Sequence, residues 1–238
     1  MEPAPLITPG AVENLKRIIS PLARYHRHSV EGLEHVPMHG GALLVVHHSF
    51  ATYDGLLLGE QIHEHTGRLP TALGDDMLFR FPKLARWIRA AGIRPASPTA
   101  GMTLLTEGHL MFVAPGGMWE ALRPTRERYA VRWASRKGFC RLALRAGVPL
   151  VLSACPAADD IYRLRASRLT DAAYHRLKVP LPIVRGLGPT VIPRPVVLTH
   201  YIAPPLVPPP HDPQREAAQV DALHAEACRI MGSLLERR

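Results

Sequence analysis

The sequence predicts a single α/β domain with a mixed, mostly parallel central sheet flanked by helices. Short apolar runs at residues 41–46, 110–114 and 148–153 are bounded by turn residues, which is typical of strands buried on both faces. Segments with helical spacing lie between and around these runs, and such alternation favours parallel strands joined by helices. With 238 residues, 47% hydrophobic and 21% charged, the chain is long enough for one domain with a substantial core.

Helices are predicted where apolar residues recur every three or four positions, at residues 11–23, 132–145 and 214–235. Prolines accumulate at 180–195, which predicts an extended, irregular connection before a strand at 196–202. We therefore divide the chain into an N-terminal amphipathic helix region, an α/β domain, and a C-terminal helix that packs on the domain, at residues 1–29, 30–212 and 213–238.

The chain is strongly basic, with 29 Lys and Arg residues against 20 Asp and Glu residues and a net charge of +9. This balance predicts an anionic partner. Only 6% of residues are aromatic, and no basic run is interleaved with stacking aromatics, so we expect no nucleic acid. The segment 77–89, from Met77 to Arg89, mixes large apolar side chains with four cations. That composition predicts contact with an anionic membrane surface.

Three scattered cysteines, Cys140, Cys155 and Cys228, lack the close pairs of a zinc or redox site, so we expect reduced thiols in a cytoplasmic compartment and no metal. The N-terminus lacks a basic region followed by an apolar one, and no stretch approaches the ~20 apolar residues that span a bilayer. The expectation is a cytoplasmic protein, peripherally associated with the inner face of a membrane.

Histidines and an aspartate follow the first predicted strand. His48 and Asp54 bring an imidazole and a carboxylate to a strand end, where ligands bind in α/β sheets. An imidazole can take a proton from a hydroxyl at neutral pH, and a carboxylate on its far nitrogen would fix the tautomer. Because a His–Asp pair is more often a buried polar pair than a catalytic one, the dyad alone leaves both interpretations open.

The second predicted strand runs directly into Pro115, Gly116 and Gly117, which must turn sharply. The two glycines would let a substrate approach backbone N–H groups that stabilise an oxyanion or hold a polar headgroup, and a structural turn is the alternative. Glu120 lies three residues beyond Gly117 and is expected to bind an acceptor hydroxyl or to cap the next helix.

Together these features resemble the glycerolipid acyltransferase superfamily, over about residues 32–206. The branch that the chain resembles contains monoacylglycerol and diacylglycerol acyltransferase-like proteins, in which a Pro-Gly-Gly turn followed by Glu-Ala recurs. The features that carry the resemblance are His48 with Asp54, Pro115-Gly116-Gly117 with Glu120, Gly138-Phe139 and Val148-Pro149-Leu150.

The spacing of the dyad departs from most of the superfamily, whose members separate His and Asp by four residues. His48 and Asp54 have five residues between them, as in the branch named above. His47 would be six residues away, so His48 is preferred.

The resemblance implies a glycerol-phosphate acyltransferase-like fold and transfer of a fatty acyl group from a thioester, on CoA or acyl carrier protein, to a glycerolipid or lysophospholipid hydroxyl. His48 would be the general base and Asp54 would orient it, without a cofactor or metal. Phosphate-acceptor members carry a Glu-Gly-Thr-Arg block where this chain has Pro-Gly-Gly, which favours a neutral acceptor. Arg94 is nevertheless included among the predicted substrate-binding residues, because an arginine elsewhere could supply the missing cation; the candidates are Arg94, Arg123, Arg126 and Arg128.

Other functions stay open. A serine or cysteine hydrolase would use Ser49, Ser153 or Cys155 as nucleophile, although no Gly-x-Ser-x-Gly turn occurs in the chain. A thioesterase would use the same pocket, with water in place of the acceptor. A peripheral lipid-binding protein would use residues 77–89 and keep the dyad as a structural pair. A metal hydrolase could use His47, His48 and Asp54, or His63 and His65, but neither set is completed by further ligands at a recognisable spacing.

Overall fold

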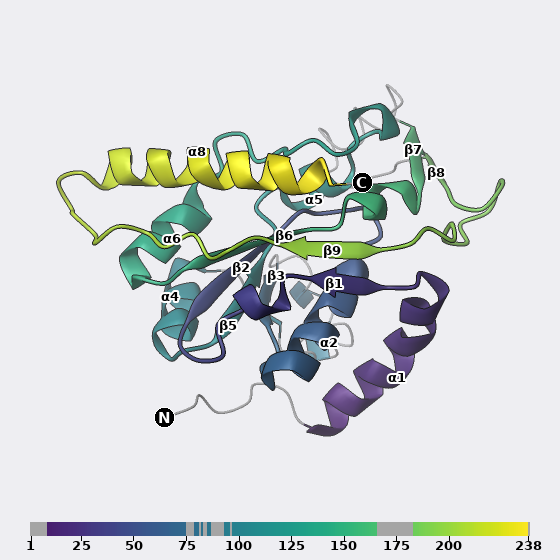
Figure 1. Ribbon diagram of the computed structural model, residues 1–238, viewed down its shortest axis with the longest axis horizontal. Coiled ribbons are helices and arrows are strands. Elements are labelled where there is room, and N and C mark those ends of the chain that lie inside the picture. The colour runs from purple at the N-terminus through teal and green to yellow at the C-terminus, as the bar shows by residue number, and fades with distance from the viewer. Residues whose placement is uncertain are drawn as a thin grey trace.

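The computed structural model describes residues 9–74, 79–80, 82, 85–86, 93–95, 97–165 and 183–237. Its centre is a seven-stranded sheet in the order β1-β9-β6-β2-β5-β3-β4, with helices on both faces (Figure 1). The strands are β1 (Ser29–Glu31), β2 (Ala42–Val46), β3 (Thr71–Gly74), β4 (Arg94–Pro95), β5 (Leu110–Val113), β6 (Leu150–Ala154) and β9 (Thr199–Ile202). A separate antiparallel hairpin pairs β7 (Arg163–Arg165) with β8 (Ile183–Arg185).

Five neighbouring strands, from β6 to β4, run parallel, and the sheet turns antiparallel only between β6 and β9. β1 is parallel to β9, so these two strands run against the other five. The mixed, mostly parallel sheet predicted from the sequence is confirmed. Because β2, β5 and β6 are adjacent and parallel, their C-terminal ends meet at one edge of the sheet.

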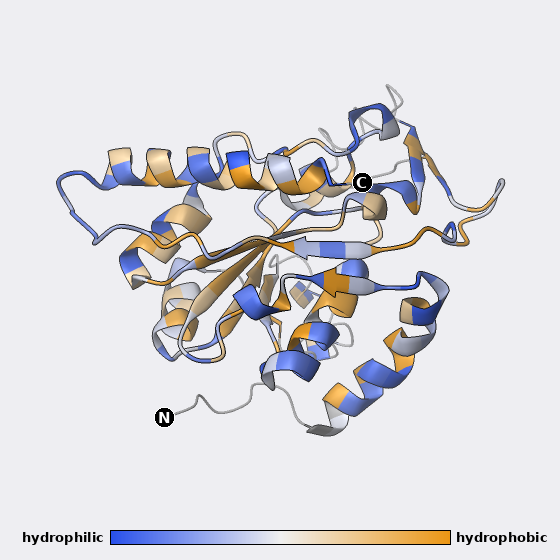
Figure 2. Cartoon of the chain, viewed as in Figure 1, coloured by the Kyte–Doolittle hydropathy of each residue, from blue (hydrophilic) through white to orange (hydrophobic). Residues whose placement is uncertain are grey.

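Helices cover the two faces of the sheet unequally. The face toward α4 (Pro98–Thr106), α6 (Gly138–Ala146) and α8 (Glu216–Leu235) buries the larger core, including Leu43, Val45 and Met111. The other face packs Leu44 and Val46 against α2 (Asp54–Thr66), and α1 (Pro9–Tyr25) packs on α2. Figure 2 accordingly shows orange central strands beneath helices of mixed colour. Among the described residues, no helix is both long enough and apolar enough to cross a bilayer.

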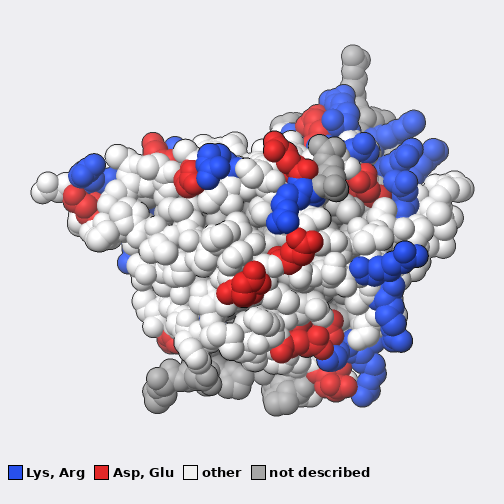
Figure 3. Space-filling model, viewed as in Figure 1, with Lys and Arg blue, Asp and Glu red and all other residues white. Residues whose placement is uncertain are grey.

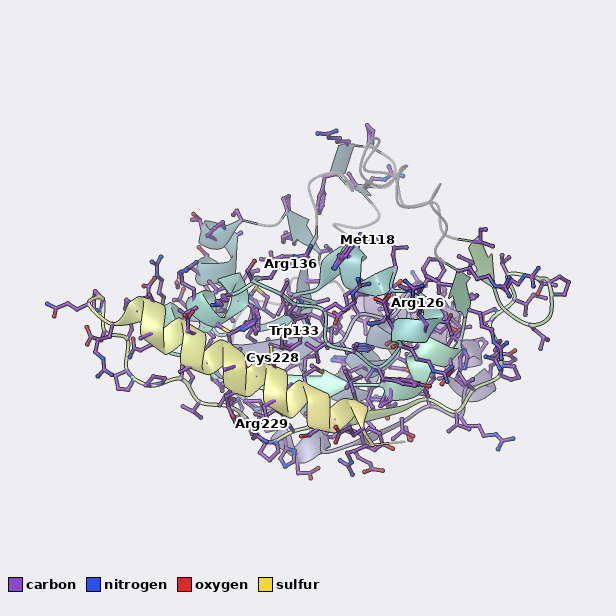
Figure 4. The ribbon with its side chains drawn as sticks, turned by 90° about the horizontal axis from the view of Figure 1, so that it is seen from above. Met118, Arg126, Trp133, Arg136, Cys228 and Arg229 are labelled. Carbon is purple, nitrogen blue, oxygen red and sulfur yellow. The ribbon has the colours of Figure 1, made fainter. Side chains whose placement is uncertain are left out.

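The helix expected at 132–145 is shorter than predicted, because α6 begins only at Gly138. Trp133 is completely buried and packs edge-on against Phe139, with 5.2 Å between ring centroids. Ala134 has a φ of 49°, which interrupts helical geometry. Figure 4 shows Trp133 beside α8, so this side chain fills the core, whereas residues 134–136 are exposed and form no helical turn.

The remaining boundaries agree with the sequence to within a few residues. The helices expected at 11–23 and 214–235 correspond to α1 and α8, and the strand expected at 196–202 corresponds to β9. The proline-rich connection contributes β8 and then runs without further helix or strand to β9. The predicted membrane segment 77–89 lies mostly outside the described residues.

Candidate active site

The candidate site lies at the C-terminal edge of the three central parallel strands. His47 and His48 follow β2 directly, Pro115 to Gly117 follow β5, and Asp159 lies in the short 3₁₀ helix Pro156–Asp160 after β6. The strand ends thus bring together residues that are more than 100 positions apart in the sequence. A small cavity beside them is lined by Phe50, Arg123 and Asp159, among others.

His48 is partly exposed, and its ring nitrogen Nε2 has no hydrogen-bond partner among the residues that the structure describes. Its Nδ1 lies 3.0 Å from the backbone oxygen of Ser49. A carbonyl oxygen only accepts, so Nδ1 carries the proton and Nε2 keeps its lone pair. Burial lowers the pKa of His48, and the nearby Arg123 guanidinium lowers it further, against a smaller opposing effect of the Ser49 carbonyl. The imidazole is therefore neutral at pH 7, as a general base must be.

His47 is buried and occupied. Arg123 donates from Nη1 to Nε2 of His47 at 2.9 Å, and from Nη2 to the backbone oxygen of His48 at 2.6 Å. Because a guanidinium only donates, Nε2 of His47 accepts and the ring is neutral. Burial and Arg123 both hold its pKa well below 6.5. Of the two neighbouring histidines, His48 is the one with a ring nitrogen available to a substrate.

Arg123 is itself held by an acidic residue from the next strand end. Its Nη2 lies 3.4 Å from Oδ1 of Asp159, and the two side chains are 3% and 5% exposed. Removing one partner of such a buried pair leaves an uncompensated charge. The pair therefore ties the end of β6 to the loop after α5 (Gly117–Ala121) and keeps His48 in place through its backbone.

Asp54 does not contact His48 directly, although both side chains are among the described residues. The hydroxyl of Ser49 donates to Oδ1 of Asp54 at 2.8 Å, and the carbonyl of the same serine receives Nδ1–H of His48. This differs from the direct contact expected from the sequence. Asp54 is the first residue of α2, where its carboxylate faces the backbone N–H groups of the helix start. Ser49 therefore lies between Asp54 and His48.

Two further histidines lie behind Asp54. Nε2 of His200, on β9, is 3.9 Å from Oδ2 of Asp54, and Nδ1 of His200 is 3.0 Å from Nε2 of His28. Burial lowers the pKa of both imidazoles, to about 4 for His28. Neither His28 nor His200 was predicted, because nothing in their local sequence places them opposite the first turn of α2.

Glu120 is completely buried and supports the backbone of His48. Oε2 accepts from the N–H of His48 at 3.3 Å, and Oε1 accepts from the N–H of Arg132 at 3.2 Å. A Cβ atom at Gly116 would lie 2.3 Å from Cβ of Glu120, so only glycine leaves room for this carboxylate. The contact between Glu120 and an acceptor hydroxyl stays a prediction.

The Pro-Gly-Gly turn is held closed by its own hydrogen bonds. Gly117 has a φ of 52° and donates its N–H to the oxygen of Ala114 at 3.0 Å. Arg136 donates to the backbone oxygens of Pro115 and Gly116. The N–H of Gly117 is thus engaged, which leaves Gly116 as the glycine whose N–H could meet a substrate.

Arg94 lies farther from His48 than the other predicted site residues. It sits on β4, in register with Leu73 of β3, and three strand-to-strand steps separate β4 from β2. At a spacing of about 4.8 Å per step, the two backbones are about 14 Å apart. The structure therefore does not bring Arg94 to the edge of β2, and its predicted role in substrate binding stays a prediction.

The candidate nucleophiles of a hydrolase are all buried. Ser49, Ser153 and Cys155 are at most 2% exposed, and burial raises the pKa of Cys155 well above that of a free thiol. No cluster of His, Cys, Asp or Glu within the described part of the chain has the geometry to hold a metal ion.

A larger, mostly apolar groove of about 610 Å³ lies between α4 and α6, over β5 and β3. Leu73, Met102 and Leu142 contribute apolar surface, and the aliphatic stems of Arg141 and Arg145 border it. Its β5 residues are only a few positions before Pro115, which links the groove to the candidate site.

Comparison with known proteins agrees with this architecture. The model of the Acyltransferase family matches residues 27–155, a span that includes His48, Asp54, Gly116 and Glu120. The chain belongs to this family.

Relatives of this acyltransferase-family chain include a bovine protein named "DGAT1/2-independent enzyme synthesizing storage lipids", which is 28% identical over 229 residues. That alignment covers 90% of this chain, and the chain spans 65% of the bovine protein. An uncharacterized protein of Mycobacterium bovis is 30% identical over 189 residues, covering 74% of this chain and 53% of that protein.

A solved structure also resembles the chain. The crystal structure of the 1-acyl-sn-glycerophosphate (LPA) acyltransferase PlsC from Thermotoga maritima superimposes with a TM-score of 0.61. The superposition covers 95% of this chain and 80% of that one, at 15% identity. A likeness at this identity shows the fold, which is the one that the sequence resemblance implies.

Proposed function

We propose that this protein transfers a fatty acyl group from an acyl thioester, on CoA or acyl carrier protein, to a hydroxyl of a glycerolipid, with His48 as general base. The observation that carries the proposal is the tautomer of His48. Its proton is held on Nδ1 by the Ser49 carbonyl, so Nε2 is free to accept a proton at the edge where the three strands end.

In the proposed step, the acceptor hydroxyl oxygen attacks the thioester carbonyl carbon while its proton moves to Nε2 of His48. The tetrahedral intermediate then collapses, the carbon–sulfur bond breaks, and the thiolate takes the proton back from the imidazolium. The base contributes about 10²- to 10⁴-fold, and the positioning of the two substrates supplies further acceleration. Glu120 and Arg123 assist by fixing the backbone of His48 from two sides.

The groove between α4 and α6 supports a long-chain acyl group. It is lined mainly by aliphatic side chains, and a buried methylene contributes about 0.8 kcal/mol. Arg141 and Arg145 border the same groove, and both pair with Glu216, at 3.2 Å and 2.8 Å.

The arginines near the site support a neutral acceptor. Arg123 is buried against Asp159, Arg126 pairs with Glu127 at 3.2 Å, and Arg128 pairs with Asp160 at 3.3 Å. These three cations, named above as candidates for binding a phosphate, are already paired with carboxylates. We therefore propose a mono- or diacylglycerol as acceptor in preference to a lysophospholipid.

The test is acyl transfer by the purified protein, with radiolabelled acyl-CoA and acyl carrier protein as donors and monoacylglycerol, diacylglycerol and lysophosphatidate as acceptors. His48→Ala should lower kcat by about 10²- to 10⁴-fold. His65→Ala, an exposed histidine on α2, is the matched control and should retain activity.

Equal turnover by the His48 variant would refute the assignment of the base. Release of free fatty acid without acyl transfer to any acceptor would instead identify a thioesterase that uses the same pocket, with water in place of the acceptor hydroxyl.

A further inference from the structure

One end of the molecule combines exposed arginines with exposed aliphatic side chains. In the β7–β8 hairpin, Leu164 points inward and is 7% exposed, whereas Arg163, Arg165 and Arg185 are all exposed. Arg163 and Arg185 stand directly opposite each other in the antiparallel pair. None of the three arginines forms an ion pair with a residue that the structure describes.

Two like charges at directly opposed positions destabilise a hairpin unless an anion lies between or above them. Lys and Arg side chains also gather along the edge of the molecule that carries this hairpin and the end of α1 (Figure 3). The surface charge at this end therefore matches an anionic partner.

The loop after β8 adds an aliphatic tip beside these charges. Leu187, Val191 and Ile192 are 52%, 71% and 54% exposed, and Ile183 on the outer face of β8 is 53% exposed. Large aliphatic side chains clustered next to cations are typical of proteins that enter the headgroup and upper acyl region of a bilayer.

The same loop is held in shape by hydrogen bonds between its own backbone groups. Gly186 donates to the oxygen of Thr190 at 2.6 Å, and Leu187 donates to the oxygen of Ile192 at 2.8 Å. Thr190 in turn donates to the oxygen of Leu187 at 3.3 Å. A loop whose backbone groups are paired internally loses little hydration energy when it enters an apolar layer.

This end adjoins the candidate active site. The hydroxyl of Thr125 contacts both backbone groups of Leu164, and Leu164 borders the small cavity that Arg123 and Asp159 also line. A bilayer in contact with β7 and β8 would lie close to the edge where His48 is exposed.

We propose that the outer face of the β7–β8 hairpin and the loop 186–192 form the surface with which the protein docks on an anionic lipid bilayer. The arginines contact lipid phosphates, and the aliphatic tip inserts between headgroups. This surface is distinct from segment 77–89, and its binding is measured without substrate, so the proposal is independent of acyl transfer.

The first measurement is co-sedimentation of the full chain with vesicles of phosphatidylcholine alone and of phosphatidylcholine mixed with phosphatidylglycerol. Arg163→Gln with Arg185→Gln should weaken binding to the anionic vesicles about 25-fold, because each cation at such a surface contributes about fivefold. The matched control replaces Arg215, just before α8, and Arg229, on α8, by Gln. Both arginines are exposed, and the control has the same net charge as the hairpin variant. It should bind like the unmodified protein.

The second measurement separates insertion from charge. Leu187→Ser with Val191→Ser should lower binding at least tenfold even at high salt, where the contribution of the arginines is screened. Melting curves confirm that each variant folds.

Three results would overturn the proposal. The first is equal loss of binding in the arginine pair and its control. The second is loss of binding only when Arg80 and Arg86, in segment 77–89, are replaced by Gln. The third is a dimer in the absence of vesicles that the hairpin variants dissociate, since the face would then join two copies of the chain.

Discussion

Replacing Asp54 by Asn should stabilise the protein at neutral pH. The carboxyl is 5% exposed, and burial raises its pKa to about 6 from an ordinary 3.8, despite the opposing hydrogen bonds from Ser49 and from the start of α2. Between these two values the folded state keeps a proton that the unfolded chain has already lost. Stability conferred by this group is therefore complete at low pH and falls as the pH rises from about 4 to about 6.

The size of the effect follows from the two pKa values. Between pH 4.5 and pH 7.5, ionisation of Asp54 alone should lower the free energy of unfolding by about 2 kcal/mol. Asn has no such titration, and its amide oxygen still accepts from the hydroxyl of Ser49. The difference in stability between Asp54→Asn and the unmodified protein should therefore grow by about 2 kcal/mol over that interval.

Urea unfolding of both proteins, followed by fluorescence of the three tryptophans, gives the difference in unfolding free energy at each of the two pH values. Titrating groups that do not interact with Asp54 change equally in both proteins and cancel. A difference in stability that stays constant between the two pH values would show that Asp54 does not titrate as its burial requires, and the reasoning would fail.

Further predictions concern the same site. Asp54→Asn should lower kcat by less than about tenfold, far less than His48→Ala, because the tautomer of His48 is held by a backbone carbonyl; equal losses would indicate direct contact during turnover. Gly116→Ala should lower the free energy of unfolding by about 1–3 kcal/mol and also lower kcat, since its Cβ would displace Glu120 from the N–H of His48. The control is Gly232→Ala on α8, where a Cβ meets no neighbouring atom, and it should raise the free energy of unfolding by up to about 1 kcal/mol. In a profile of kcat/KM against pH, the acidic limb should lie below 6.5, because burial lowers the pKa of His48 and the base stays neutral there; an acidic limb above 6.5 would contradict this environment.

The sheet was predictable because its central strands are buried on both faces. A run such as residues 42–46, with every member buried, reads as apolar whatever packs against it. The edge strands β1 and β4, and β3 beside β4, have two to four residues that are mostly not buried, so their sequences carry no such pattern. The predicted start of a helix at residue 132 was wrong for a similar reason. The position of Trp133 is decided by packing in the core and not by local helical spacing.

At the site, local sequence was sufficient for what lies next to a strand end. His48 and the Pro-Gly-Gly turn were found because turns and polar residues after buried runs mark the C-terminal edge of a parallel sheet. The partners of these residues come from elsewhere in the chain. Arg123, in the loop after α5, contacts both histidines and pairs with Asp159, which follows β6, and His200 reaches Asp54 from β9.

Periodicity and turn chemistry in the chain were enough to predict the fold class and the central strands, and the resemblance to a known family added the choice of His48 as the proposed base. Tertiary structure decided which histidine keeps a free nitrogen, that Ser49 stands between His48 and Asp54, and where arginines and aliphatic side chains share one surface. The physical reason is the distance along the sequence over which each kind of interaction acts. Backbone patterns depend on neighbours a few residues away, whereas hydrogen-bond partners, burial and surface charge depend on which distant segments the sheet brings together.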